Sequence, residues 1–328
     1  MSSESENEVD VKEEKPILED YNELIRKANK IPVKHKRREE IRKAIRQKKK
    51  LKKKDRDSRR KEAEALGEDA PPKQVPHTLE SLREKDETMV NHEGSDSEVE
   101  EDIKIDEFES YFNQSYVPKV VITSSANPCL KTRLFLKELC QVIPNSTAFH
   151  RRQSAVKKMI SSSIERGFTD VIVINEHNKE PCSMLVTHLP TGPTAFFRLS
   201  NVKLTKHIKR DWREITSHRP EVILNNFNTR LGVTIGRMLG VLFHYDPQFK
   251  GRRVATFHNQ RDYIFFRHHR YEFKKDGQKA ALRELGPRFT LKLKSLQHGT
   301  FDSKTGEYEW IITNKRHQME TSRRKFFL

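Results

Sequence analysis

The sequence predicts an α/β protein in which a folded domain of two related α/β halves follows a charged N-terminal extension that is largely disordered or helical. Three observations support this fold class. The formal net charge is +17, and the basic surplus lies in residues 117–328, whereas residues 1–116 are slightly acidic. Strand-like and helix-like patterns alternate between residues 117 and 314. A similar order of elements recurs after Pro220, although the residue identities do not repeat.

Residues 1–75 are predicted to form a charged tail that contains one basic helix. The helix covers residues 35–66, where apolar residues are too sparse to bury much surface. Between Arg26 and Lys61 there are 20 basic and 4 acidic residues. Two interpretations remain open, because the segment suits either a solvated tail or a nuclear or nucleolar targeting signal that also binds RNA phosphates.

Residues 76–116 are predicted to be an acidic linker. Nine acidic residues and one lysine lie between Glu93 and Glu109. Such a stretch either shields the neighbouring basic segment from the wrong nucleic acid or simply keeps the chain soluble. Ser95 and Ser97 precede acidic residues, and phosphorylation there would add further negative charge.

The folded domain is predicted to span residues 117–314, and its first half covers about residues 117–219. Gly167 is expected to end the second helix of this half, and a Pro-Thr-Gly-Pro turn is expected to join its last two strands. The expected order is strand 118–125, helix 132–144, helix 154–167, strand 169–177, strand 181–190 and strand 194–204.

The second half covers about residues 220–314 and is followed by a basic C-terminal tail, residues 315–328. One helix of this half carries three glycines at a spacing of four, which predicts close packing. Its elements are expected in the order strand 221–227, helix 229–246, two strands within 251–273, short helix 279–286, an alternating strand 288–299, and a hairpin 300–312 that turns at Lys304–Gly306.

Cysteine spacing and hydropathy exclude several classes of protein. Cys129, Cys140 and Cys182 form no CxxC pair, so we expect buried thiols in a reducing compartment, with neither a disulfide framework nor a zinc site. No apolar run approaches the roughly 20 residues that span a bilayer. The acidic, polar N-terminus does not fit a signal peptide. The sequence therefore predicts no membrane association.

Catalytic motifs are not apparent. His268 and His269 are adjacent, and in a strand they would point to opposite faces and could not easily share one metal ion. Only Asp262 and Glu272 are acidic between residues 251 and 273. A nuclease would need a metal or acid–base cluster, and we find none in the sequence. We therefore expect a protein that is not an enzyme and uses no metal and no cofactor.

Residues 251–273 combine strand-forming aromatics with five arginines and three histidines. Such a strand pair either has arginines that merely solvate an edge or has a face built for phosphate contact and base stacking. Alternation divides the second strand into two faces, one with Tyr263, Phe265, Arg267 and His269 and the other with Ile264, Phe266, His268 and Arg270. The predicted RNA-binding residues are Arg252, Arg253, Arg261, Arg267, His269, Arg270, Arg288, Lys292 and Lys294, together with Arg151, Arg152, Lys157 and Lys158.

Three long runs of the sequence resemble proteins of the Brix-domain family. They are VPKVVITSSANPCLKTRLFLKELCQVIPN, then RLGVTIGRMLGVLF with GRRVATFHNQRDYIFFRHHRY, then ELGPRFTLKLKSLQHGTFDSKTGEYEW, and the resemblance covers roughly residues 78–328. Many members of the family carry an arginine before the Asn-Pro of the first loop, where this chain has Ala126. This difference weakens the case for RNA contact at that loop.

The resemblance implies a fold of two related α/β halves, similar to the anticodon-binding domain of class II aminoacyl-tRNA synthetases. It also implies a non-catalytic assembly factor of the nucleus and nucleolus that binds precursor rRNA and serves large (60S) ribosomal subunit biogenesis. Its expected partners are the pre-60S particle and a maintenance-of-killer type assembly factor. The alternative is a protein–protein adaptor that sits in pre-ribosomes without specific RNA contacts.

Overall fold

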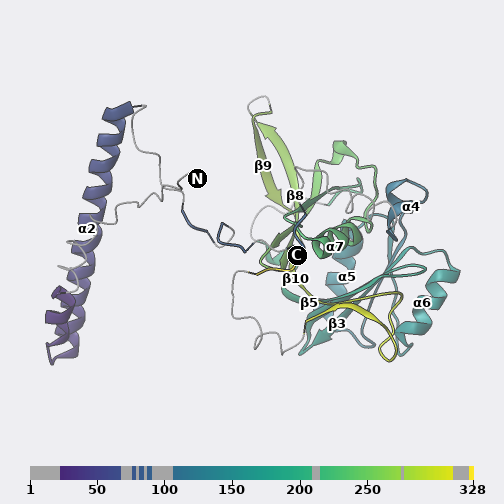
Figure 1. The fold of residues 1–328 in the computed structure, drawn as a ribbon. Helices are drawn as coiled ribbons and strands as arrows, with labels where there is room; N and C mark the ends of the chain where they lie inside the picture. Colours follow the sequence, from purple (N-terminus) through teal and green to yellow (C-terminus); the bar gives the residue numbers. More distant parts are fainter. Residues whose placement is uncertain are drawn as a thin grey trace, which may run out of the picture. The chain divides into compact units, whose positions relative to one another are not determined.

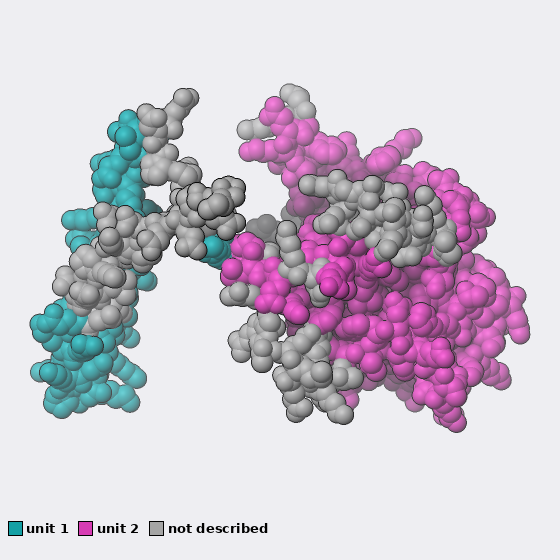
Figure 2. Space-filling view, viewed as in Figure 1, with its two compact units in different colours: residues 1–77 teal, residues 78–328 magenta. Residues whose placement is uncertain are grey.

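The computed structural model describes residues 23–67, 76–78, 81–84, 87–90, 106–208, 215–274, 277–312 and 325–328. The chain divides into two compact units, residues 1–77 and residues 78–328 (Figure 2). Residues 91–105 of the expected acidic linker, which include Ser95 and Ser97, lie outside the described residues, as do residues 315–324 of the expected C-terminal tail.

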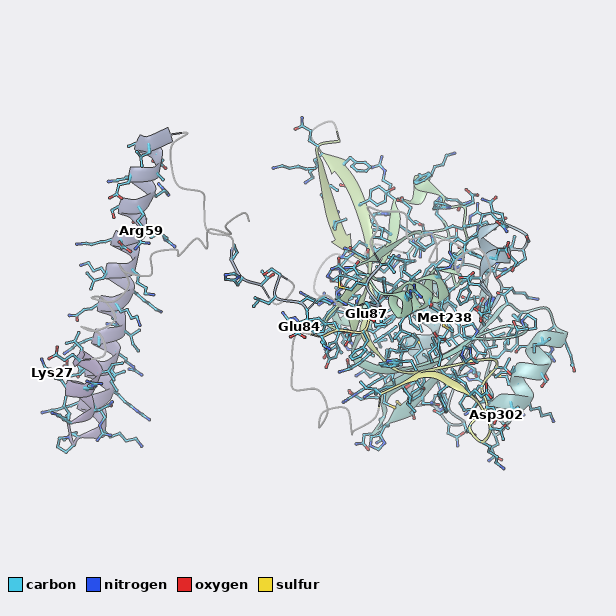
Figure 3. The ribbon with its side chains drawn as sticks, in the orientation of Figure 1. Lys27, Arg59, Glu84, Glu87, Met238 and Asp302 are labelled. Carbon is cyan, nitrogen blue, oxygen red and sulfur yellow. The ribbon has the colours of Figure 1, made fainter. Side chains whose placement is uncertain are left out.

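The first unit contains the predicted basic helix as α2 (Lys34–Leu66), which follows a short helix at residues 23–29. Of the residues in α2, only Ala44 is buried. Its ion pairs are exposed and join residues three or four positions apart, such as Arg59–Asp55 at 3.3 Å. An exposed i,i+4 pair stabilises a helix by only about 0.3–0.5 kcal/mol. Figure 3 shows long side chains projecting from this unit, with Lys27 and Arg59 labelled. The helix therefore has little apolar surface with which to form a core.

The second unit is built on one large mixed sheet (Figure 1). After α4 (Glu109–Phe112), its first half comprises β1 (Val120–Ser124), α5 (Leu130–Val142), β2 (Ser146–Ala148), α6 (Val156–Glu165), β3 (Asp170–His177), β4 (Glu180–His188), β5 (Thr194–Lys203) and η2 (Thr205–His207). Its second half comprises β6 (Glu221–Asn225), α7 (Arg230–Gly240), η3 (Phe249–Gly251), β7 (Arg253–Gln260), β8 (Tyr263–Lys274), β9 (Lys279–Glu284), β10 (Arg288–Gln297) and β11 (Tyr308–Ile311).

The strand order shows that the two halves are built alike. The main path of the sheet is β2-β1-β3-β4-β5-β10-β8-β7-β6. In the first half β1 is parallel to β3, and β3, β4 and β5 then form an antiparallel meander. In the second half β6 is parallel to β7, and β7, β8 and β10 repeat the meander. The halves meet where β5 pairs antiparallel with β10. The predicted recurrence of element order is therefore present as a symmetric strand order.

Helices cover the two faces of the sheet unequally. Helices α5 and α7 pack on one face, where they bury Phe135 and Ile235 in the larger hydrophobic core with Phe266 of β8. Helix α6 packs on the opposite face and buries Ile160 in a smaller core. That smaller core extends across β1, β3 and β4 and includes Phe196 of β5 and Phe301 of the segment after β10. Beyond β5, none of the described helices contributes to a core on that face.

Two predicted elements are corrected by the structure. Residues 279–284 form strand β9 instead of a helix, because they pair with β8 through contacts such as Leu282 opposite Tyr271. Helix propensity is a weak prior, and pairing with a neighbouring strand overrides it here. The expected hairpin at 300–312 has only one strand, β11, which pairs back onto β10 with Trp310 opposite Leu296. The short strand β2 was not predicted.

The three glycines of α7 pack against different neighbours. A Cβ at Gly232 would lie 2.9 Å from the backbone carbon of Leu328, and one at Gly236 would lie 3.3 Å from the Phe227 ring. A Cβ at Gly240 would meet Leu224 at 3.5 Å, an ordinary van der Waals distance. The predicted close packing is therefore real at the first two positions, and its partners are a loop residue and the segment 325–328.

These distances predict opposite effects for two alanine substitutions. Gly232→Ala should lower the free energy of unfolding by about 1–3 kcal/mol, because the backbone of Leu328 must move. Gly240→Ala should raise it by up to about 1 kcal/mol, because alanine favours the helix and meets no clash. Urea unfolding of both variants checks this. Equal effects at the two sites would contradict the packing described.

No helix among the described residues is long and apolar enough to cross a membrane.

Candidate nucleic-acid interface

Strand β8 separates the aromatic and basic residues of 251–273 as alternation predicts. Ile264, Phe266 and His268 are at most 1% exposed and face the larger core. Phe265 and Arg267 lie between them on the other face and are partly exposed. One face of β8 therefore belongs to the hydrophobic core, and the face that carries Phe265 and Arg267 points away from it.

Neighbouring strands extend this second face into a platform. Lys292 of β10 lies opposite Arg198 of β5, and Thr290 lies opposite Phe265 of β8. Thr256 of β7 lies opposite Arg267. We define the open sheet face as Arg198, Thr290, Lys292, Lys294, Tyr263, Phe265, Arg267, His269, Thr256 and His258. It lies on the side of the sheet away from α5 and α7, beyond the part that α6 covers.

Cations and aromatic rings alternate on the open sheet face. The Lys292 Nζ lies 4.6 Å from the centroid of the Tyr263 ring, and Tyr263 is 41% exposed. The Arg267 guanidinium lies 5.9 Å from the Phe265 centroid and donates from Nη1 to the Phe266 carbonyl at 2.8 Å. Cations over ring faces leave both groups accessible to a ligand that carries negative charge and flat rings.

Arg288 borders the open sheet face, where it lies close to Glu284 and to the face residue His269. Arg288 forms a two-point ion pair with Glu284, with Nε 2.7 Å from Oε1. Burial lowers the pKa of His269, and the attraction of Glu284 only partly opposes it. Burial also lowers the pKa of Arg267, and repulsion by Arg288 adds to this effect. The expected role of His269 is therefore that of a neutral ring that can stack or hydrogen-bond at neutral pH, and not that of a cation.

Arg253 is not part of a surface, contrary to our expectation. It is 2% exposed, and its guanidinium is held between the halves. Nη1 donates to the carbonyls of Thr216 and His218, both at 2.6 Å, and Nη2 donates to the carbonyl of Gln141 at 2.8 Å. Burial lowers the pKa of Arg253 to about 10, so it stays charged at neutral pH. Its donors serve the fold and cannot contact an RNA phosphate.

His268 completes this buried network. Its Nδ1 donates to the carbonyl of Gly286 at 2.7 Å, and its Nε2 accepts from Arg253 Nε at 3.2 Å. Burial, with a contribution from the nearby Arg253 charge, lowers the pKa of His268 to about 3. Accepting a bond at Nε2 requires the neutral ring, so geometry and electrostatics agree. His268 and His269 face opposite sides of the sheet, as predicted.

The other predicted basic residues lie in separate places. Arg252 and Arg261 are exposed at turn positions with φ of 47° and 55°, one at each end of β7. In the strand register Arg270 lies opposite Arg253 of β7 and Arg283 of β9, on the side of the sheet that carries α7. None of these three joins the open sheet face.

The second predicted basic cluster surrounds the start of α6. Arg151 donates to the carbonyls of Ser124 at 3.3 Å and Ser154 at 3.2 Å. Lys157 pairs with Asp302 at 3.1 Å. Arg152 and Lys158 are exposed. Lys157 and Lys158 belong to α6 itself, so this cluster is separate from the open sheet face.

Arg198 is a basic residue of the open sheet face that sequence reasoning missed. It is exposed in β5 between the buried residues Phe197 and Leu199. That alternation is readable in the sequence, but only the pairing of β5 with β10 places Arg198 beside Lys292.

The first loop after β1 is already occupied by a side chain of the protein. The Glu176 carboxylate accepts from the Cys129 backbone amide at 2.9 Å and from Thr132 at 2.7 Å. These are the groups at the start of α5 that an anion would use. The difference at Ala126 and this internal carboxylate both argue against RNA contact at this loop.

The described part of the chain has neither a metal-binding cluster nor a disulfide. No group of three or more His, Cys, Asp or Glu side chains there could hold a metal ion. The three cysteines form no disulfide and are partly buried, and burial raises the pKa of Cys140.

Comparisons with known proteins identify the family of this chain. A family model for the Brix domain matches residues 125–295. The probable ribosome production factor 1 of Drosophila melanogaster is 60% identical over 282 residues, which cover 85% of this chain and 71% of that protein. Ribosome production factor 1 of Xenopus laevis is 56% identical over 265 residues, covering 81% and 76%. The crystal structure of a probable ribosomal biogenesis protein from Aeropyrum pernix K1 covers 60% of this chain and 99% of its own, at 15% identity and a TM-score of 0.42. The chain belongs to the Brix-domain family.

Proposed function

We propose that this protein is a non-catalytic assembly factor in ribosome biogenesis that binds precursor rRNA of the large (60S) subunit in the nucleolus. Relatives named ribosome production factor 1 support the role in ribosome biogenesis. The open sheet face is the single observation that supports RNA binding, because it joins cations and exposed aromatic rings on strands without a covering helix among the described residues.

The chemistry of this face suits unpaired RNA. Arg198, Lys292 and Lys294 would contact phosphates, and Arg267 would contact a phosphate or stack on a base. Tyr263 and Phe265 would stack with bases, which are accessible in loops and bulges but not inside a helix. These side chains project from paired strands of a sheet, so the open sheet face is preorganised in the free protein. Less conformational entropy of the protein is therefore lost when RNA binds.

Replacing Arg198, Arg267, Lys292 and Lys294 with alanine should weaken binding to single-stranded precursor rRNA fragments. Each lost phosphate contact should reduce the slope of log affinity against log salt by about 0.7. The control replaces Lys137, Lys206, Lys250 and Lys304, which are exposed elsewhere and remove the same charge. Filter binding at several salt concentrations measures both. Equal losses in the two variants would show that only net charge matters and would overturn the proposed face.

A second candidate, the protein–protein adaptor, is favoured by the β8–β9 hairpin, which extends beyond the rest of the sheet (Figure 1). Phe273 and Leu282 on this hairpin are 64% and 59% exposed. A maintenance-of-killer type assembly factor is the partner we propose for apolar surface of this kind. RNA crosslinking in cells separates the candidates, because an adaptor would enter pre-60S particles yet give only background crosslinks.

A further inference from the structure

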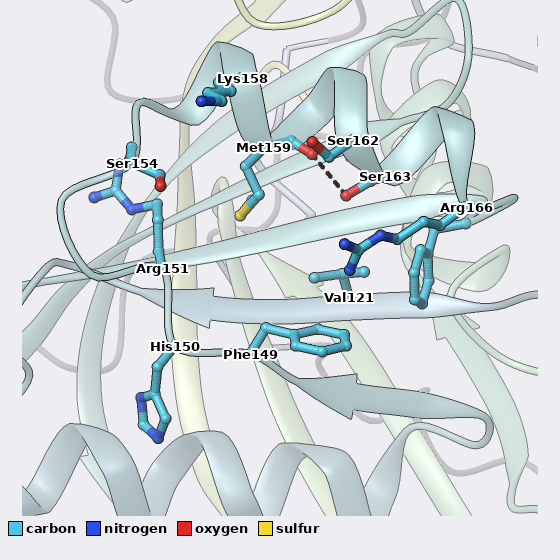
Figure 4. A pocket seen from close by; sticks show the side chains of 11 residues that line it. Val121, Phe149, His150, Arg151, Ser154, Lys158, Met159, Ser162, Ser163 and Arg166 are labelled. Carbon is cyan, nitrogen blue, oxygen red and sulfur yellow. Dashed lines mark hydrogen bonds between the residues drawn. The ribbon is translucent and has the colours of Figure 1, made fainter.

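A cavity of about 310 Å³ lies between α6 and the segment that follows β2 (Figure 4). Its walls come from β1, from α6, and from the residues around Phe149 and Phe168. It is separate from the open sheet face, because its lining comes from β1, α6 and neighbouring loops and includes no residue of that face. Its volume is at the lower end of the range of about 300–1,000 Å³ that is usual for small-molecule sites, and so it suits one small ligand.

One part of the cavity is apolar and aromatic. Phe149 and Phe168 meet edge to face, with ring centroids 6.2 Å apart and planes at 87°. Met159 projects from α6 toward them (Figure 4). The backbone of Phe149 is fixed to β1, because its amide donates to Ile122 at 2.9 Å and its carbonyl accepts from Thr123 at 2.7 Å. Phe149 is nevertheless 41% exposed, so a large ring is held in place at the opening.

The remaining wall of the cavity is basic. Arg151, Lys158 and Arg166 line it, and no carboxylate is among the described residues that do so. Two backbone carbonyls orient the Arg151 guanidinium. The hydroxyls of Ser154 and Ser162 add further polar groups to the lining. Three cations beside a fixed aromatic wall form a site for an anion that also carries a flat apolar ring.

We propose that this cavity binds one unstacked nucleotide of single-stranded RNA. The proposal rests on the proposed RNA-binding function and gives the protein a second RNA site, distinct from the open sheet face. The base packs against Phe149, Phe168 and Met159, and the flanking phosphates contact Arg151, Lys158 and Arg166. A phosphorylated peptide would use the cations but would leave the aromatic wall uncovered. Duplex RNA keeps its bases inside the helix and so cannot fill the cavity.

The test uses the full-length chain and two labelled probes, a uridine dodecamer and a ribose-phosphate chain of the same length without bases. Phe149→Ala should lower the affinity for the uridine chain at least fivefold, since stacking of a base on an aromatic ring contributes about 1–3 kcal/mol to binding. It should change affinity for the abasic chain less than twofold. Phe249→Ala is the matched control, because Phe249 is 65% exposed in the other half of the domain.

Two adjacent lysines give a second comparison. Lys158→Ala should lower the salt slope by about 0.7, whereas Lys157→Ala should not, because Lys157 pairs with Asp302 and does not line the cavity. Thermal unfolding of Phe149→Ala and of Phe149→Leu, which keeps apolar bulk but no ring, separates loss of stacking from loss of folding. Binding of the leucine variant should also be weakened.

Several results would overturn the inference. Equal losses on the uridine and abasic chains would show that no base enters the cavity. Displacement of RNA by a phosphoserine peptide, unaffected by Phe149→Ala, would assign the site to a phosphopeptide. If the open-face variant loses RNA binding while Phe149→Ala and Lys158→Ala behave like their controls, the proposed function stands and this site is excluded. If the wild-type protein binds neither chain, both proposals are excluded.

Discussion

Replacing Arg253 with alanine should lower the free energy of unfolding by about 3–5 kcal/mol, a large part of the roughly 5–15 kcal/mol that stabilises an ordinary domain. The substitution leaves the partly buried carbonyls of Thr216 and His218, and the carbonyl of Gln141, without their donor. It also leaves His268 Nε2 without a partner. Each unsatisfied buried group costs about 1–3 kcal/mol, and partial relaxation or entry of water keeps the total below the sum.

The neighbouring Arg252 provides a matched control. It is exposed and adopts φ of 47°, a conformation that asparagine tolerates. Arg252→Asn should therefore change stability by less than about 1 kcal/mol. Guanidinium unfolding followed by tryptophan fluorescence measures both variants. If Arg253→Ala is as stable as Arg252→Asn, the buried network is not what holds the halves together at this point.

Acid should destabilise the domain through His268. The folded-state pKa of about 3 is below the ordinary unfolded value of about 6.5, so the unfolded chain binds a proton that the folded chain does not. Stability from this histidine is therefore fully present above pH 6.5 and is lost as the pH falls toward 3. The loss is about 1.4 kcal/mol per pH unit, or about 3 kcal/mol between pH 6.5 and pH 4.

The His268→Asn variant tests this expectation through its slope. Its unfolding free energy should fall with decreasing pH less steeply than that of the wild type, by about 1.4 kcal/mol per unit between pH 6 and pH 4. The variant loses one acceptor and is less stable throughout, so the slope is the informative quantity. An NMR titration in which the His268 ring protonates near pH 6 would contradict the buried, neutral state.

Local patterns in the sequence were sufficient to predict most of the fold. Strands such as β3 and helices such as α5 follow from apolar runs and from helical spacing, and the symmetric order of the halves follows from their recurrence. Strand β9 could not be predicted, because Ala280, Ala281 and Leu282 favour a helix when considered alone. Only their pairing with β8 makes them a strand, and that contact is not a local property.

The candidate site was less predictable than the fold. Alternation correctly separated the two faces of β8, because a side-chain period of two is local. Arg252 and Arg253 are equivalent in the sequence, yet one is exposed and the other is 2% exposed. The carbonyls that bind Arg253 belong to segments far away along the chain. The same reason explains why Arg198 was missed, since its partner lies on β10.

The seam between β5 and β10 has a consequence for synthesis of the protein. Ser200 and Thr290 meet across it although they are 90 residues apart in the chain. At about 5–20 residues per second, β5 emerges from a ribosome roughly 5–20 seconds before its partner strand exists. During that interval the first half ends in an unpaired edge that can pair with a strand of another nascent chain. Separate expression of the two halves would leave that edge open indefinitely, so they form one folding unit despite their similar design.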